Sequence, residues 1–479
     1  MKTGKVLFVG AGPGDPTLVT LKGMAALQQA DVVIFDRLVH PGLLAYTRHD
    51  ARLIYAGKEA AHHVMAQAEI NRLLVEEARR GQVVVRLKGG DPGFFGRVGE
   101  EAQACREAGI PFDVIPGVTS GTAAPMYAGI PLTHRDYHSS VTFLTGHRAK
   151  NAAHELNWAA LAALPSLVIY MGVKNLPVIQ QQLLAHGMAP DTPVAVVRWG
   201  TVSRQQTVVG QLGNIDRIVQ AARIQSPAII VIGDIVRLRE ELNWYETKPL
   251  FGTTVACAVE AMPSDNPWTV HLASRGAEVI PVPLTPRLFP PAEAEQFIQT
   301  LPTCRWLVFG NRRQVDFFFQ IVTDRRWDVR QLTAQLAACG EATADSLRQR
   351  GLQPAHVLPA ELPLAHLRRR LAAAPDERIG LLLGHGEKTV VDKNTLVLSL
   401  GRLSWDDTHP AARLLASQPV DWLAASDPDH LDGLAKFVGD GWQERPLFCS
   451  DVQTAQRAQE MGWKRVVTDL EGLLEAAVV

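Results

Sequence analysis

The sequence is poor in net charge, in long apolar runs and in clustered cysteines, and each shortage excludes a class of protein. Its 48 lysine and arginine residues nearly balance its 49 aspartate and glutamate residues, so the formal net charge is −1. No global field therefore favours nucleic acid or a membrane surface, and local Arg and Lys side chains must hold any anionic ligand. Because no run of about 18 apolar residues occurs, we expect no membrane span.

The five cysteines are scattered, with no C-x-x-C pair and no Cys/His cluster. The paired His62 and His63 also have no third ligand at a metal-like spacing. We therefore expect no metal site. Scattered thiols that stay reduced are typical of the cytosol, and we expect no signal peptide before the first predicted strand. The sequence thus predicts a cytoplasmic protein.

The stretch KVLFVGAGPGDPTLVTLKG, residues 5–23, is the first candidate for ligand binding. Its apolar run predicts a buried parallel strand, its glycines permit a tight turn, and a helix follows. This order indicates a nucleotide or a nucleotide-like ligand. Two familiar motifs fail, however, because Asp15 replaces the third glycine of the dinucleotide fingerprint and the Gly-Lys-Ser/Thr of a phosphate loop is absent. Pro13 also lacks an N–H for phosphate, and an ordinary structural turn remains the alternative.

Strand and helix patterns alternate through the first 115 residues and predict a parallel α/β sheet. Strands are expected at 5–9, 31–35, 52–56, 82–87 and 112–115. The segment 115–136 is rich in small residues and predicts a junction between subdomains. A second α/β unit follows, with strands in SVTFLTGH, SLVIYMGV, PVAVVRWG and PAIIVIGDIV and a hairpin-type strand in RQQTVVGQL. It ends near LREELNWYETKPLFG, which is interpreted as a linker.

A further α/β region begins near Gly252 and contains an imperfect internal echo. Residues 306–322 resemble residues 421–438, and residues 339–351 resemble residues 449–462. In each case a strand leads into a turn and then into a helix. An internal repeat of this kind predicts two similar lobes rather than one large sheet.

Residues 1 to about 248 carry an ordered set of motifs that closely resembles the uroporphyrinogen-III C-methyltransferases, which belong to the tetrapyrrole (class III) methyltransferases. The motifs are VGAGPGDPTLVTLKG, DVVIFDRLV, GKEAAHHVMAQAEIN, RLKGGDPGFFGRVGEE, PGVTSGTAAPMYAGIPLTHRD, YMGV, VVRWGT and SPAIIVIGDIVRL. The resemblance implies a two-lobed α/β fold, with subdomains of about 1–115 and 116–248 and S-adenosylmethionine (SAM) in the cleft between them. The first glycine turn would form one wall of that cleft, and Pro13 agrees with this because SAM has no phosphate.

The resemblance also implies which residues contact SAM. They are Pro13, Gly89, Gly90, Asp91, Phe94, Thr119, Ser120, Met171 and Gly200. These residue types suit the ligand. Glycines let the backbone approach it, the Asp91 carboxylate can accept from a hydroxyl or ammonium group, and Met171 offers a soft apolar contact.

The activity that the resemblance implies is methylation of uroporphyrinogen III at C2 and C7, which yields precorrin-2 and S-adenosylhomocysteine (SAH). A sulfonium methyl group is already activated, so the enzyme must hold an electron-rich pyrrole carbon in line with it and help a proton to leave. By resemblance, Asp36 and Lys58 have acid–base roles. Arg97 is expected to stabilise charge, because guanidinium does not normally lose a proton, and Glu100 either orients Arg97 or takes a proton.

The tetrapyrrole carries many carboxylates, and local cations are needed to bind it. By resemblance, the residues on the tetrapyrrole side are Arg97, Glu100, Arg135 and Met171. Arg86 and Lys88 are interpreted instead as solvated surface ion pairs that flank the strand. Gly93 and Val98 replace the Phe and Gly of many relatives, which affects the expected geometry of this loop but not the reaction class.

Residues 252–479 resemble uroporphyrinogen-III synthase more distantly, through the internal echo and the stretches GAEVIPVP, WLVFGNRRQVDFFF and ACGEATADSLRQRGL. The resemblance implies one lobe at about 252–286 plus 418–479 and a second lobe at about 287–417. Several family positions are changed: Ala258 and Val259 replace a Thr-Arg pair, Gly310 and Asn311 replace Thr-Ser, Asp451 replaces a glycine, and TLVLSLGRL lacks a common tyrosine. Because these changes remove cations and hydroxyls that would bind an acidic bilane, we expect reduced or lost synthase activity.

Two alternatives remain open at this stage. The N-terminal half could act on a later corrin precursor, although PLTHRD and VVRWGT favour the early substrate. The C-terminal half could be only a non-catalytic module for binding or assembly. The resemblance also suggests a homodimer formed through the methyltransferase half.

Overall fold

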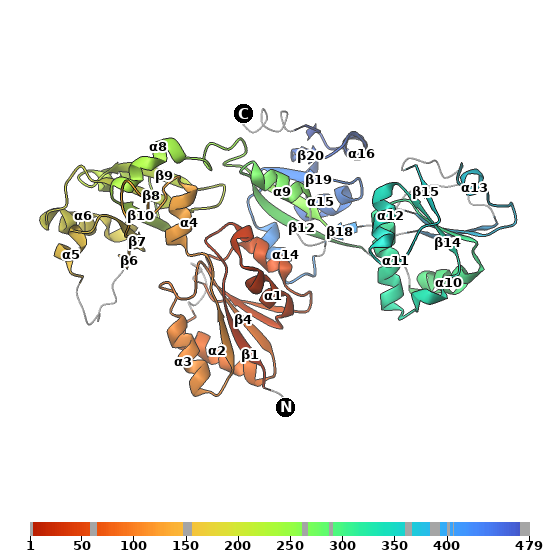
Figure 1. Cartoon of the computed structure of the whole chain (residues 1–479), viewed down its shortest axis with the longest axis horizontal. Helices are drawn as coiled ribbons and strands as arrows, with labels where there is room; N and C mark the ends of the chain where they lie inside the picture. The colour runs from red at the N-terminus through yellow and green to blue at the C-terminus, as the bar shows by residue number, and fades with distance from the viewer. Residues whose placement is uncertain are drawn as a thin grey trace. The chain divides into compact units, whose positions relative to one another are not determined.

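A computed structural model describes residues 3–57, 65–146, 156–260, 267–286, 291–359, 366–383, 393–399, 403–405 and 407–469. The described residues form four β-sheets with helices packed on them (Figure 1). The chain divides into two compact units. Unit one is Met1–Pro283 with Asp406–Pro428 and Phe437–Val479, and unit two is Leu284–Trp405 with Asp429–Lys436. No helix in the described ranges is long and apolar enough to cross a membrane.

The first sheet of unit one has five parallel strands in the order β3-β2-β4-β1-β5. They are β1 (Lys5–Gly10), β2 (Val32–Phe35), β3 (Arg52–Tyr55), β4 (Val83–Lys88) and β5 (Phe112–Ile115). Each predicted strand is present, and the predicted parallel α/β sheet is confirmed. Helices α2 (Gln67–Arg79) and α3 (Val98–Glu107) lie on one face and α1 (Leu21–Gln29) lies on the other (Figure 1). Strands buried on both faces explain the continuous apolar runs.

The second sheet of unit one is mixed, in the order β6-β7-β10-β8-β9. Its strands are β6 (Thr142–Thr145), β7 (Leu167–Tyr170), β8 (Pro193–Arg198), β9 (Gln206–Gln211) and β10 (Ala228–Ile232). The predicted hairpin strand is confirmed, because β9 pairs antiparallel with β8. The helices of this region are α4 (Ser120–Tyr127), α5 (Trp158–Ala162), α6 (Leu176–Ala185), α7 (Ile215–Ala221) and α8 (Arg239–Leu242).

The segment after α8 is packed, whereas the sequence predicts a linker there. Tyr245 is 6% exposed and Leu250 is fully buried. The Glu246 carboxylate accepts hydrogen bonds from Gln205 Nε2 at 2.8 Å and from Thr207 Oγ1 at 2.6 Å. The linker interpretation is therefore wrong, because buried apolar and carboxylate side chains fix this segment to the second sheet and to the sheet that follows.

The third sheet contains the parallel strands β12-β11-β19-β20-β21. They are β11 (Thr254–Val259), β12 (Glu278–Pro286), β19 (Trp422–Ala425), β20 (Leu447–Cys449) and β21 (Val466–Val467). Strand β12 continues into unit two, where its last residues pair antiparallel with β18 (Leu403–Trp405). The helices of this region are α9 (Pro267–Ser274), α14 (Ala412–Ala416) and α16 (Val452–Met461), while most of α15 (His430–Val438) belongs to unit two.

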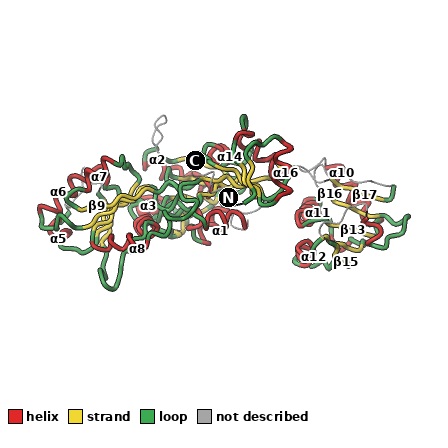
Figure 2. The backbone as a smooth tube through the Cα atoms, turned by 90° about the horizontal axis from the view of Figure 1, so that it is seen from above, coloured by secondary structure: helices red, strands yellow, loops and turns green. Residues whose placement is uncertain are grey.

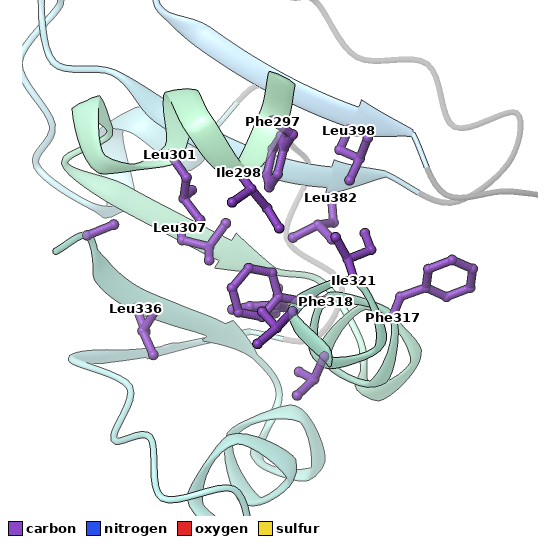
Figure 3. Close-up of a cluster of buried hydrophobic side chains, with 14 of the residues drawn as sticks. Phe297, Ile298, Leu301, Leu307, Phe317, Phe318, Ile321, Leu336, Leu382 and Leu398 are labelled. Atoms are coloured by element: carbon purple, nitrogen blue, oxygen red, sulfur yellow. The ribbon is translucent and has the colours of Figure 1, made fainter. Parts of the chain in front are cut away.

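Unit two has a parallel sheet in the order β15-β14-β13-β16-β17. Its strands are β13 (Trp306–Phe309), β14 (Gln335–Cys339), β15 (His356–Leu358), β16 (Ile379–Leu383) and β17 (Thr395–Ser399). Helices α10 (Pro291–Thr300), α11 (Arg312–Asp324) and α12 (Glu341–Arg348) lie beside this sheet, which also carries α13 (Leu367–Arg370) (Figure 2). Figure 3 shows Phe297 of α10 and Phe318 of α11 in the resulting core.

The internal echo of the sequence corresponds to equivalent strand–helix pairs in two separate sheets. Strand β13 and helix α11 match β19 and α15, and β14 and α12 match β20 and α16. In both sheets the two strands concerned are neighbours. Two similar sheets rather than one large sheet are therefore confirmed, while the lobe boundaries drawn from the sequence stay predictions.

Three loops at the carboxyl ends of β1, β4 and β5 meet through glycine backbones. Gly12 and Gly90 exchange hydrogen bonds, with N···O distances of 3.2 and 2.7 Å. A Cβ on Gly10 would lie 2.5 Å from the Cα of Gly117, and a Cβ on Gly117 would lie 2.5 Å from the carbonyl oxygen of Gly90. Side chains here would force the loops apart, so this close approach requires glycine.

Replacing Gly117 by Ala should lower the free energy of unfolding by about 1–3 kcal/mol, because the new methyl group overpacks a contact between backbones. Gly99 on α3 is the matched control, since a Cβ there meets nothing within 4 Å. Denaturant midpoints of Gly117→Ala, Gly99→Ala and the unaltered chain measure the difference. Equal midpoints for the two variants would contradict the role given to this contact.

Candidate active site

A cavity of about 980 Å³ lies in unit one, where loops of the first two sheets face each other. From the first sheet it is lined by the segments that follow β1, β2 and β4, and from the second sheet by those that follow β7 and β8. Its volume is in the range of about 300–1,000 Å³ that is usual for small-molecule sites. Ligands of open α/β sheets bind at the carboxyl ends of the strands, which is where this cavity opens.

The structure places several of the predicted site residues in the wall of this cavity. They are Pro13, Asp36, Gly89, Gly90, Ser120, Met171 and Gly200. They come from separate loops of both sheets, so the fold brings together residues that are far apart in the sequence. Six of them belong to the predicted SAM set, and Asp36 belongs to the predicted acid–base pair.

Asp91, Phe94 and Thr119 do not line the cavity, but they contact residues in or beside its wall. The exposed Phe94 ring lies 6.3 Å from the ring of Tyr170, a lining residue. The Asp91 carboxylate accepts from Gly93 N at 2.7 Å and from Gly117 N at 2.8 Å, which ties two of the glycine loops together. Burial raises the pKa of Tyr170, a lining residue, so its hydroxyl keeps its proton. That hydroxyl accepts from Gly121 N at 2.9 Å and can donate to Thr119 Oγ1 at 2.7 Å.

Of the remaining predicted residues, Arg97, Glu100 and Arg135 do not line the cavity. Arg97 and Glu100 form two hydrogen bonds of 2.8 and 2.7 Å, and more than half of each side chain is exposed. These bonds lower the pKa of Glu100, which makes it a weak proton acceptor and favours its predicted role of orienting Arg97. Arg135 is exposed in the turn between His134 and His138. The structure does not describe Lys58.

Asp36 is held by a buried network of charges. Its Oδ1 accepts from Arg86 Nη2 at 2.6 Å. Glu101 of α3 accepts from Arg86 Nε at 3.2 Å and from Lys88 Nζ at 2.9 Å. Arg86, Lys88 and Glu101 are 2%, 4% and 0% exposed, whereas the Asp36 side chain is 30% exposed. The two buried cations are therefore offset by one buried carboxylate and by one that faces the cavity.

The interpretation of Arg86 and Lys88 as solvated surface pairs is therefore wrong. Helix α3 covers the face of β4 on which they lie, and burial together with the charge of Arg86 lowers the pKa of Lys88. The sequence held a signal for this. Two charges spaced two residues apart in the apolar strand VVVRLK share one face, and buried charges need partners.

Two lining residues have strained backbone. Met171 has φ 53° and Trp199 has φ 50°, which is the left-handed region that non-glycine residues seldom adopt. Such residues cost about 1–3 kcal/mol each and persist where the surroundings fix them. Thr201, with φ 77°, is fixed in this way: its hydroxyl accepts from Asp15 N at 3.0 Å and its N–H donates to Gln205 Oε1 at 2.8 Å. These strained residues lie in the segments after β7 and β8, where the second sheet meets the cavity.

Sequence reasoning missed three cations in the wall, Arg37, Lys174 and Arg204. Each lies a few residues beyond a strand end, inside or next to a motif that was already quoted. The Arg204 guanidinium carbon lies 3.8 Å from the centre of the Trp199 ring. Among the described residues, none of the three forms an ion pair with a carboxylate. Their position after strand ends was the signal available in the sequence.

Two family models match the chain in succession. Residues 5–216 match the Tetrapyrrole (Corrin/Porphyrin) Methylases, and residues 266–475 match Uroporphyrinogen-III synthase HemD. A uroporphyrinogen-III C-methyltransferase of Bacillus subtilis is 46% identical over 361 residues, which are 75% of this chain and 74% of that protein. A protein of the same name from Priestia megaterium is 52% identical over 234 residues, 49% of this chain and 98% of that protein.

A crystal structure of uroporphyrin-III C-methyl transferase from Thermus thermophilus, complexed with S-adenyl homocysteine, is 36% identical. It covers 49% of this chain and 100% of that one, with a TM-score of 0.42. The identity and coverage of the Bacillus subtilis relative decide the family. The chain belongs to the uroporphyrinogen-III C-methyltransferases, a family of tetrapyrrole methylases, and its C-terminal half matches uroporphyrinogen-III synthase.

Proposed function

We propose that the chain transfers methyl groups from SAM to C2 and C7 of uroporphyrinogen III, giving precorrin-2 and SAH. The observation that carries this proposal is the cavity of unit one. Its wall combines Pro13, Gly89, Gly90, Met171 and Gly200 from loops of both sheets. The family resemblance assigns these five residues to SAM binding, and all five line this one cavity.

The wall residues fit SAM as the methyl donor. When bound, SAM supplies a sulfonium methyl group that is already activated for transfer. Pro13 offers no N–H, and SAM has no phosphate that would need one. A Cβ on Gly90 would have no heavy atom nearer than 3.7 Å, and its φ of 72° suits glycine, so this backbone leaves room for a ligand. Met171 is 48% exposed and offers its thioether to an apolar contact.

The lining cations suit the acidic side chains of a tetrapyrrole. Arg37, Lys174 and Arg204 approach the cavity from three separate loops. Arginine can hold a carboxylate through two hydrogen bonds, which fixes orientation as well as charge. We infer that these three residues bind substrate carboxylates, while Arg97 and Arg135 keep their predicted roles on the tetrapyrrole side.

Asp36 is the described member of the predicted acid–base pair. It follows β2 and faces the cavity, with its side chain 30% exposed. The hydrogen bond from Arg86 holds the carboxylate in one orientation. We infer that Asp36 takes the proton that leaves the methylated pyrrole carbon, either directly or through a water molecule.

Incubation of the full chain with uroporphyrinogen III and SAM should yield a product that carries two added methyl groups, a net gain of two CH2 units because a proton leaves at each transfer, with SAH released. Mass spectrometry of the product measures this directly. An unchanged tetrapyrrole would contradict the proposal. Methylation of a later corrin precursor in place of uroporphyrinogen III would support the alternative substrate instead.

The variant Asp36→Asn should lower kcat by about 10²–10⁴-fold, because a general base contributes on this scale and the amide cannot take the proton. SAH affinity should stay near that of the unaltered chain, which calorimetry can check. Asp113→Asn is the matched control, since Asp113 is an exposed carboxylate on β5 of the same sheet. Equal kcat values for the two variants would show that Asp36 takes no part in proton transfer.

We also propose that the C-terminal half keeps a synthase-like fold but has little or no ring-closing activity. The changed family positions serve the fold instead. Ala258 and Val259 are buried at the end of β11. Asn311 caps α11 by accepting from Gln314 N at 3.0 Å. Asp451 caps α16 by accepting from Thr454 N at 2.7 Å, so its carboxylate is engaged within the protein.

The full chain, without SAM, should therefore not accelerate formation of the type III isomer from hydroxymethylbilane. Separation of the oxidised type I and type III porphyrins by chromatography measures the outcome, with bilane alone as the baseline. Type III product formed faster than the spontaneous type I product would establish an active synthase and overturn this proposal.

A homodimer formed through the methyltransferase half and a cytoplasmic location are proposals that rest on the sequence and the family. The cysteines are compatible with a reducing compartment, because all five are buried free thiols. Burial raises the pKa of Cys105 to about 11 and that of Cys257 to about 12, which keeps these thiols protonated and unreactive.

A further inference from the structure

The wall of the methyltransferase cavity is completed by the C-terminal half. Glu278 begins β12, and Leu414, Ser417 and Gln418 lie on and just after α14; all four line the same cavity as Asp36 and Gly200. All of these residues belong to unit one. The half of the chain that matches the synthase family thus contributes part of the surface at which methylation is proposed.

Glu278 makes the most specific contacts among these residues. Its Oε1 lies 3.1 Å from His40 Nε2. Its Oε2 accepts from Ser203 Oγ at 2.8 Å and from Ser203 N at 3.2 Å. The side chains of His40 and Glu278 are 4% and 10% exposed, and Ser203 is 3% exposed. Both oxygens of one buried carboxylate are therefore engaged, each with a different loop.

The two loops are the opposing walls of the cavity. His40 ends the segment that begins with Asp36 after β2 of the first sheet. Ser203 lies between Gly200 and Arg204 in the segment after β8 of the second sheet. Glu278 thus connects the loop of the proposed proton acceptor to the loop of a proposed cofactor contact.

The hydrogen bonds of His40 define its protonation. Gly42 N donates to His40 Nδ1 at 3.0 Å, so Nδ1 is the unprotonated nitrogen. The proton is then assigned to Nε2, which donates to Glu278. A neutral histidine, a serine hydroxyl and a backbone N–H all donate to one carboxylate, and a glutamine could not accept all three bonds.

We propose that Glu278 of the C-terminal half is a positioning residue for methyl transfer, fixing the separation of the Asp36 and Gly200 loops. The inference rests on the function proposed for this cavity and deepens it. This role for Glu278 gives the C-terminal half a contribution to methylation, even though that half lacks several polar residues of its own family. The packed segment that joins the two halves is tied to the start of β12, because Leu250 N donates to Arg275 O and Glu278 N donates to Thr253 O, both at 2.9 Å.

The variant Glu278→Ala should lower kcat/KM for uroporphyrinogen III by about 10–100-fold, because small displacements of reacting groups have effects of this size. It should also weaken SAH binding, since the Gly200 loop loses its support, and release more singly methylated product. Glu278→Gln should lie between Glu278→Ala and the unaltered chain, because an amide of the same shape can accept from one loop but not from both.

Glu444→Ala is the matched control, a carboxylate of the same half that is 65% exposed and pairs with Lys464. A purely structural role for Glu278 would reduce the amount of folded protein but leave KM, SAH affinity and the ratio of singly to doubly methylated product unchanged. Glu278→Ala with the same kcat/KM and SAH affinity as Glu444→Ala overturns the proposal.

Ser203→Ala covers the case in which Glu278→Ala fails to fold, because it removes one bond to Oε2 and leaves the bond to His40. It should weaken SAH binding, and an unchanged affinity counts against the proposal. Failure of the proposed function gives a different result. The unaltered chain would then methylate no uroporphyrinogen III, while the SAH affinities of the variants would still report on Glu278.

Discussion

The close approach of three glycine loops is the constraint on which the methyltransferase half depends. Gly10, Gly90 and Gly117 meet backbone to backbone, and no side chain fits between them. Asp91 strengthens this contact because its carboxylate accepts from Gly117 N. The loops are therefore held close enough for residues from β1, β4 and α4 to share one wall. In this turn, which resembles a nucleotide motif, the glycines let the backbones of the loops meet.

The charge network around Asp36 provides partners for the buried charges behind this wall. Without a partner, the Asp36 side chain at the end of β2 could adopt several orientations. Arg86 fixes one of them, because its Nη2 donates to Asp36 Oδ1 at 2.6 Å. Arg86 is itself buried, and it is tolerated only because Glu101 accepts from it and from Lys88. Helix α3 thus acts on the site without touching the cavity. The proton transfer proposed for Asp36 would need a carboxylate with a fixed orientation, and the hydrogen bond from buried Arg86 holds it in one.

Most of the fold could be predicted because its strands are short apolar runs separated by helical patterns, as β1 and β4 illustrate. Glycine and proline positions in the wall could be predicted because they lie in local motifs. The partners of the buried charged residues could not be predicted. Glu101 lies on a helix that follows β4, and Glu278 is 238 positions from His40. Contacts of this kind arise only when the chain has folded, since spacing in the sequence does not encode which loop a carboxylate will meet.

The C-terminal half contributes residues to the wall of the methyltransferase cavity, whatever its own activity. Among its changed family positions, Ala258 and Val259 are buried, and Asn311 and Asp451 cap helices, so these four residues are engaged within the fold. Glu278, by contrast, has both carboxylate oxygens engaged by the methyltransferase loops. A buried carboxylate is costly to maintain without such partners. If the C-terminal half were only joined to the methyltransferase half by the chain, it would not need to bury the Glu278 carboxylate against that half. The burial of Glu278 is expected if the surface of the C-terminal half serves as one wall of the methyltransferase cavity.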